Sequence, residues 1–308
     1  MAEVLGLGKV SREVFRRSVL PFIPIDRELE LDGATVKLTK RTVVAHSPSI
    51  GVPLETLGYF AFHYAASNVA CRFGKPTHII TGIYLPLKTR EVELRTIAKS
   101  LGDEAKKFSV IIAAGQTATY YGLEIPFVST TCLGEQRRPV GKPREGDVAL
   151  IAGEVGGEAV WLTSLSRGTS DQRWRSLTAL PTILALHDVE GVKLLHDVSE
   201  GGVKGALMEV LESVELSLSF SSGDVAYANG SEKLSQDLLR APTYGALIII
   251  VEPDSVEKVV RVCDEREVKV SRLGSLRRGF GLFIDGEEVR EQARVEIDEL
   301  YGTFRRLD

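Results

Sequence analysis

The first half of the chain alternates between long stretches with apolar residues at helical spacing and short, mostly apolar runs. Leu57–Phe73 is predicted to be a helix. Arg90–Phe108 keeps its apolar residues on one face, which predicts a second helix. Gly74 and Pro76 follow the first stretch and predict its end. The segments predicted to be extended are Leu29–Ala45, Ile79–Leu85, Val110–Ala113 and Phe127–Thr131.

The second half shows the same alternation of helical and extended patterns. Helices are predicted up to Trp161, over Leu177–Leu186 and after Asp254, which is placed to cap the last of them. Asp285-Gly286 is typical of a hairpin turn. The predicted strands are Val148–Ala152, Ala246–Val251, Val268–Leu273 and Gly281–Ile284. This order of elements favours a mixed α/β or α+β architecture.

The amino-acid composition changes between the two halves of the chain. Gln136–Gly146 contains two prolines, two glycines and four cations, and it is predicted to be an inter-domain linker. Arg137, Arg138 and Lys142 are candidate anion contacts, but the composition of the segment favours a solvated linker.

His196-Asp197-Val198-Ser199-Glu200-Gly201-Gly202 is the most informative stretch of the chain. It leads directly into a helical pattern, and the first N–H groups of a helix can face an anion because they lack an internal partner. The glycines would let a ligand approach the backbone, and His196, Asp197 and Glu200 could take part in acid–base chemistry. An ordinary helix capped by Asp197 or Ser199 is the alternative.

Composition narrows the class of protein. The chain has 308 residues, of which 44% are hydrophobic and 26% charged, so it can bury a sizeable core in one or two domains. A net charge of −4 gives no argument for nucleic-acid binding or an anionic membrane, and the charged N-terminus predicts a cytoplasmic protein. Cys71, Cys132 and Cys263 lie far apart without metal-like spacing, so buried thiols are expected.

The Gly-Gly stretch also resembles a known family. Gly191–Gly202, followed by Ala206-Leu207-Met208-Glu209, is similar to the central C-terminal-domain motif of the aminoimidazole ribonucleotide synthetase (AIR synthase) superfamily. This superfamily includes the hydrogenase maturation dehydratase, selenophosphate synthetase, thiamine-monophosphate kinase and formylglycinamidine ribonucleotide synthetase. Other segments match it in order, and the first is similar to the opening of archaeal members close to the hydrogenase maturation protein. These segments are Gly8–Phe15, Leu57–Ala70 with Gly74–Pro76, Ala113–Thr117, Gly146–Val148 with Gly156-Gly157, and Pro242–Ile248.

The resemblance implies an α+β protein of two domains, each a mixed sheet backed by helices. Residues 1–140 would form the N-terminal-like domain, which dimerises and faces nucleotide and metal. Residues 146–308 would form the C-terminal-like domain with the Gly-Gly helix start. The resemblance further implies a homodimer, ATP or another phosphorylated ligand at the interface, and Mg or Mn as cofactor.

The family's acidic positions are depleted in this chain. Asp32 stands at the first of them, although a turn residue beside Gly33 would look the same. Ser47 and Asn68 stand where the family has aspartates, and Gln116 and Ala118 replace a histidine and an acid. Neutral side chains offset none of the charge of a divalent ion, so metal affinity should fall.

The resemblance still assigns a role to each matching position. His196, Asp197 and Glu200 are the catalytic candidates, and Asp32 and Asp197 are the candidate metal ligands. The candidate nucleotide contacts are Asn68, Gln116, Thr117, Ser199, Gly201 and Gly202. His46 and His63 fit hydrogen-bonding or packing roles better than metal ligation.

Three functions are compatible with these residues. The chain could bind ATP or another phosphorylated ligand, with phosphoryl transfer at a depleted metal site. It could be a metal-dependent phosphatase or small-molecule kinase that uses Asp32, Asp197 and Glu200. It could also be a non-catalytic maturation partner or scaffold that kept the fold and the dimer. The sequence does not identify a substrate.

Overall fold

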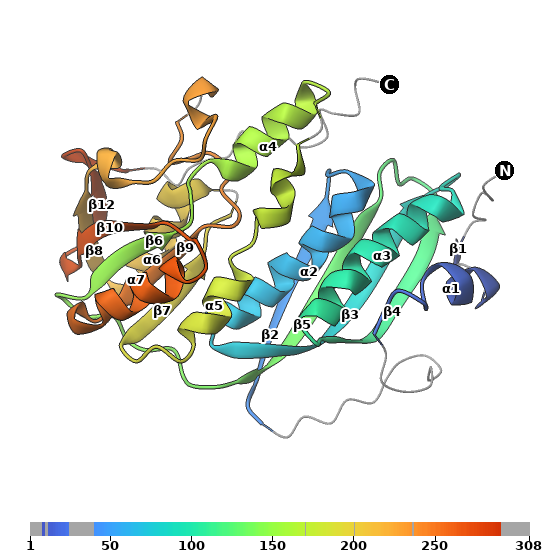
Figure 1. Cartoon of the computed structure of the whole chain (residues 1–308), viewed down its shortest axis with the longest axis horizontal. Helices are drawn as coiled ribbons and strands as arrows, with labels where there is room; N and C mark the ends of the chain where they lie inside the picture. The colour runs from blue at the N-terminus through green and yellow to red at the C-terminus, as the bar shows by residue number, and fades with distance from the viewer. Residues whose placement is uncertain are drawn as a thin grey trace. The chain divides into compact units, whose positions relative to one another are not determined.

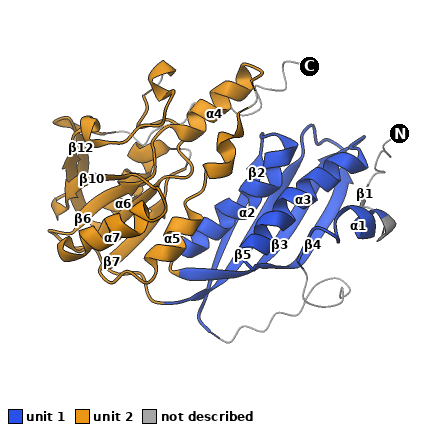
Figure 2. Ribbon diagram, viewed as in Figure 1, with its two compact units in different colours: residues 1–70, 74–137 blue, residues 71–73, 138–308 orange. Residues whose placement is uncertain are grey.

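The computed structural model describes residues 8–9, 12–24, 40–169, 171–199, 201–235 and 237–290, with side chains from residue 14 onward. The chain forms two compact units, coloured separately in Figure 2. Unit 1 comprises Met1–Ala70 and Gly74–Arg137, and unit 2 comprises Cys71–Phe73 and Arg138–Asp308. Each unit combines helices with mixed sheet, so the expected two-domain α+β architecture is confirmed.

Unit 1 is a five-stranded sheet in the order β1-β4-β3-β5-β2, with α2 and α3 lying over one face (Figure 1). All neighbouring strands are antiparallel except β3 and β4. The strands are β1 (Gly8–Lys9), β2 (Thr42–Ile50), β3 (Gly74–Pro86), β4 (Ile111–Tyr120) and β5 (Phe127–Gln136), and the helices are α1 (Arg12–Ser18), α2 (Leu54–Cys71) and α3 (Glu91–Lys107).

Close packing of the two long helices explains part of the sequence of unit 1. A Cβ at Gly58 of α2 would lie 2.4 Å from the carbonyl oxygen of Ile97 on α3, so only glycine fits there. Between the helices and the sheet lie fully buried side chains such as Phe60, Val69 and Ile79. The helix pattern read from Leu57–Phe73 is therefore confirmed as α2, with bounds shifted by two or three residues.

Unit 2 contains two four-stranded sheets, β10-β6-β9-β7 and β11-β8-β12-β13. The strands are β6 (Val148–Ala152), β7 (Val192–Asp197), β8 (Leu216–Phe220), β9 (Leu247–Val251), β10 (Val270–Ser275), β11 (Arg277–Arg278), β12 (Gly281–Ile284) and β13 (Glu287–Glu288). The helices are α4 (Gly157–Ser166), α5 (Leu180–Leu186), α6 (Gly202–Val214) and α7 (Val256–Asp264), with short 3-10 turns at Gln172–Ser176, Ser222–Asp224, Ser231–Lys233 and Pro253–Ser255.

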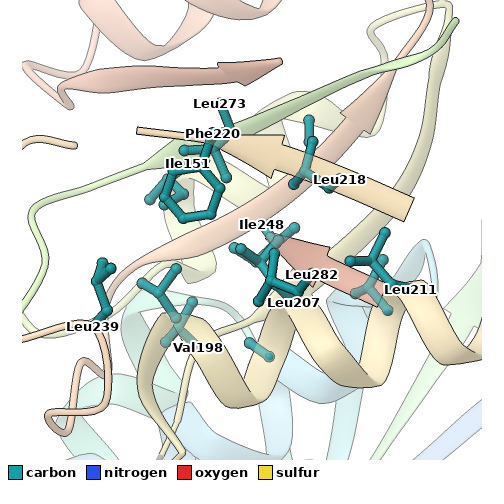
Figure 3. Close-up of a cluster of buried hydrophobic side chains, with 14 of the residues drawn as sticks. Ile151, Val198, Leu207, Leu211, Leu218, Phe220, Leu239, Ile248, Leu273 and Leu282 are labelled. Atoms are coloured by element: carbon teal, nitrogen blue, oxygen red, sulfur yellow. The ribbon is translucent and has the colours of Figure 1, made fainter. Parts of the chain in front are cut away.

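The core around α6 fixes the position of the Gly-Gly motif. Leu207 and Leu211 of α6 pack with Ile248 of β9 and Leu282 of β12 (Figure 3). Val198, just before the motif, is fully buried in the same cluster. Burial of this much apolar surface holds the strand, the loop and the helix start in one arrangement.

Several local predictions can be compared with the structure. The strands Val148–Ala152 and Gly281–Ile284 are confirmed with their predicted bounds, and Asp285 and Gly286 form the hairpin turn in the left-handed region. The three cysteines are confirmed as buried free thiols. Among the helices whose residues the structure describes, none combines the length and apolar character needed to span a bilayer.

Candidate functional site

Strand β7 of unit 2 ends in the two residues that open the Gly-Gly motif. Successive residues of a strand point to opposite faces of its sheet, so the side chains of His196 and Asp197 diverge. The His196 Nε2 atom lies 3.0 Å from the Glu209 Oε2 atom on α6. The Asp197 Oδ1 atom lies 4.0 Å from the Sγ atom of Cys71, which is the last residue of α2 and belongs to unit 2. The two catalytic candidates therefore have separate partners.

The surroundings of Asp197 shift the pKa of its carboxyl group upward. Burial raises the pKa of this carboxyl, and the charge of Glu209 acts in the same direction against the opposing effect of His196. Burial also raises the pKa of the Cys71 thiol well above its ordinary value, so the thiol stays protonated and can donate to Asp197. A carboxyl group with a raised pKa can hold and release a proton, which is the property of a general acid or base.

The Gly-Gly helix start is constrained by the chain itself. Gly202 has φ +60°, and a Cβ there would lie 2.6 Å from the carbonyl oxygen of Leu239. The expectation that this glycine makes room for a ligand is corrected, because the space is taken by the backbone of residues 239–241. Two N–H groups at this end also have partners, since Gly202 donates to Ser199 and Lys204 donates to Leu239. Ser199 is exposed on the preceding loop, and Glu200 lies outside the described residues.

Unit 1 brings two of the depleted acidic positions together. The Asn68 Nδ2 atom on α2 donates to the Ser47 Oγ atom on β2 at 3.1 Å. Ser47 lies directly opposite Thr130 of β5, and Thr130 lies directly opposite Thr81 of β3. Residues opposite one another on paired strands share a face, so these hydroxyl groups all lie on the face covered by the helices.

Gln116 lies on the other face of the same sheet. The register between β3 and β4 shifts so that Ile79 pairs with Ile112 but Ile80 pairs with Ala114, and the extra residue reverses the alternation along β4. Gln116 is exposed there and donates from Nε2 to the hydroxyl of Tyr120. Thr117, its neighbour, lies on the helix-covered side. The structure therefore separates Gln116 from Asn68.

Both halves of the chain match one family. Residues 30–136 match the AIR synthase related protein, N-terminal domain, and residues 144–285 match the AIR synthase related protein, C-terminal domain. The chain belongs to the AIR synthase-related family. The predicted family is thereby confirmed.

The chain is also similar to individual members of this family. The carbamoyl dehydratase HypE of Escherichia coli (strain K12) is 26% identical over 269 residues, which cover 83% of this chain and 77% of the relative. The thiamine-monophosphate kinase of Bacillus subtilis (strain 168) is 26% identical over 124 residues, covering 38% of this chain and 37% of the kinase. A solved structure of the hydrogenase maturation protein HypE in complex with ATP has a TM-score of 0.75 at 21% identity, covering 85% and 89% of the two chains.

The described residues do not fit the divalent ion that the family resemblance implies. Strands β2 to β5 carry a single carboxylate, Glu135, which pairs with Lys40 at 2.8 Å. Both ring nitrogens of His46 contact hydroxyls, those of Thr131 at 2.8 Å and Ser129 at 3.2 Å. Within the described part of the chain, no three His, Cys, Asp or Glu side chains converge as metal ligands. The metal candidate Asp32 lies outside that part.

Sequence reasoning missed two features of these units. Thr81 and Thr130 join the Ser47–Asn68 pair only through strand register, which no local motif signals. A cavity of about 670 Å³ in unit 2 is bordered by Lys204, Asp237 and Asp285 among others. Its charged groups already have partners, since Lys204 pairs with Asp237 at 2.6 Å and Asp285 accepts hydrogen bonds from Ser221 and Ser222.

Proposed function

We propose that this protein binds ATP or another phosphorylated ligand. The observation that supports this most directly is the match of both halves to AIR synthase-related domains, together with a HypE structure of the same fold in complex with ATP. The proposed contacts on unit 1 are Asn68 with Ser47, its hydrogen-bond partner, and Thr117. Those on unit 2 are Ser199 and the backbone of Gly201.

Titration calorimetry with ATP and ADP, with and without magnesium, tests this proposal on the full chain. We expect saturable heat with a dissociation constant below about 1 mM, the weak end of specific affinity. Absence of heat at millimolar nucleotide, under every condition, would reject the proposal.

We further propose that the protein transfers a phosphoryl group and that the Asp197 carboxyl accepts or donates the proton in this reaction. Its raised pKa supports this role, and the similarity to a thiamine-monophosphate kinase makes a phosphorylated substrate a reasonable class. Phosphate-ester turnover should be screened with magnesium, manganese and zinc. Loss of turnover in Asp197→Asn, which keeps the shape of the side chain, would support it, and unchanged turnover in that variant would exclude it.

We also propose that two copies of the chain pair through the uncovered face of the unit 1 sheet. Val44, Ile50 and Ile80 are 59%, 47% and 40% exposed, although each belongs to a strand of a packed sheet. Alternation and register place all three on the face opposite α2 and α3. A second copy would remove this apolar surface from water.

A further inference from the structure

Five uncharged polar side chains gather beneath α2 in unit 1. Asn68 donates to Ser47, and strand register places Thr130 opposite Ser47 and Thr81 opposite Thr130. Ser49 lies two residues beyond Ser47 on the same face of β2. We refer to these five residues as the polar cluster. Ser47 and Asn68 are partly exposed, while the other three are buried, so Ser47 and Asn68 form its accessible side.

The polar cluster has unused hydrogen-bonding capacity. The Oγ1 atom of Thr130, a residue with 0% exposure, and the Oγ atom of Ser49, with 1% exposure, have no hydrogen-bond partner in the described structure. Buried hydroxyls are normally paired, so these two indicate a missing partner. The Ser47 Oγ atom accepts from Asn68, so its own O–H remains available as a donor.

The polar cluster carries no negative charge that could compensate a divalent cation. Helix α2 carries one carboxylate, Glu55 in its first turn, and the neighbouring strands carry only Glu135 with its Lys40 partner. A Mg²⁺ or Mn²⁺ ion would gain no compensating charge there for the water it loses. Hydroxyl and amide N–H donors instead suit an acceptor-rich group such as a phosphoryl oxygen.

We infer that the polar cluster binds a phosphoryl group of the ligand directly, through the Ser47 hydroxyl and the Asn68 amide, without a divalent ion held by unit 1. Thr130 lies opposite Ser47 in the strand register, and Ser49 lies two residues beyond Ser47, so both flank this pair on the same face of the sheet. The inference rests on the proposed function and specifies its chemistry. It predicts that nucleotide affinity depends little on magnesium.

The test compares four proteins by calorimetry with ATP, in excess EDTA and in excess MgCl₂. For the wild type we expect dissociation constants that agree within about threefold between the two conditions. Ser47→Asp/Asn68→Asp restores two carboxylates, so ATP affinity in EDTA should fall by about tenfold or more and recover with magnesium. Asn68→Asp alone introduces a negative charge without changing the shape of the side chain. Ser47→Asn is the matched neutral control, and its ATP affinity should remain independent of magnesium.

Manganese binding without nucleotide gives a second readout. Electron paramagnetic resonance should show free Mn²⁺ with the wild type and Ser47→Asn, and bound Mn²⁺ with the double aspartate variant. Stoichiometric Mn²⁺ binding by the wild type that Ser47→Asn abolishes would overturn the inference. So would wild-type ATP binding that EDTA weakens by about tenfold or more, whereas no heat in any condition would reject the proposed function itself.

Discussion

Gly202 is the residue at which the motif is most sensitive to a single added carbon. Its φ of +60° disfavours any side chain, and an added Cβ would lie 2.6 Å from the carbonyl oxygen of Leu239. Gly202→Ala should lower the free energy of unfolding by about 2–4 kcal/mol, from backbone strain and overpacking together. Urea unfolding followed by circular dichroism measures this.

Gly205, one turn further along α6, is the control for that substitution. A Cβ there would meet nothing within 4 Å, and its φ is not positive. Gly205→Ala should therefore raise the free energy of unfolding by about 0.5–1 kcal/mol, the usual gain in a helix interior. If Gly202→Ala were as stable as Gly205→Ala, the close packing of the motif against residues 239–241 would be wrong.

At the scale of elements, α1 is attached to α3 by one carboxylate. Glu91 accepts hydrogen bonds from Arg17, at 2.8 and 2.7 Å, and from Ser18. These bonds, from Arg17 first, together with the charges of Arg17 and Arg95, lower the pKa of Glu91 to about 2. Glu91→Gln should lower the free energy of unfolding at pH 7 by about 1–3 kcal/mol, because the bonds lose their charge assistance.

The pH dependence of this effect follows from the direction of the shift. The folded-state pKa of Glu91 lies below its ordinary value of 4.5, so its stabilisation is complete above pH 4.5 and declines as the pH falls toward 2. The difference between wild type and Glu91→Gln should therefore narrow between pH 4.5 and 2. Asp103→Asn removes the exposed pair with Lys99 on the same helix and should change stability by less than about 0.5 kcal/mol. A constant difference across this pH range would contradict the assigned role of Glu91.

Local sequence patterns predict the bounds of some strands but not of others. Val148–Ala152 and Gly281–Ile284 are short apolar runs with clear ends, and their strands have those bounds. Gly74 and Pro76 indicate a stop after α2, but both lie inside β3, where a register shift between Pro76 and His78 accommodates the proline. Local patterns do not report such shifts, because they depend on the neighbouring strand.

The sequence predicts less of the candidate site than of the helices and strands. Family resemblance places Ser47 and Asn68 at related positions, and the structure shows them hydrogen-bonded. The pairing of β5 with β2 places Thr130 on the same face as Ser47. The irregular pairing of β4 with β3 places Gln116 on the opposite face. Both outcomes depend on strand register, which the composition of a single strand does not determine.

At the scale of the whole molecule, the exposed apolar face of unit 1 predicts a dimer. Ile80→Asp places a charge at the centre of that face and should convert the protein to a monomer. Val92→Asp on α3 is the control, because Val92 is 45% exposed but lies on a helix away from that face. Light scattering coupled to gel filtration gives the mass of each. A monomeric wild type, or a dimer that survives Ile80→Asp, would contradict the proposed pairing.

A crystal structure of the full chain soaked with ATP and manganese tests the central claim most directly, because it shows nucleotide and metal separately. We predict nucleotide density with a phosphoryl oxygen at hydrogen-bond distance from Ser47 and Asn68, and no anomalous manganese peak on the unit 1 side chains. Absence of nucleotide at saturating concentration would contradict ligand binding. A manganese peak between Ser47 and the phosphates would contradict direct binding by the polar cluster.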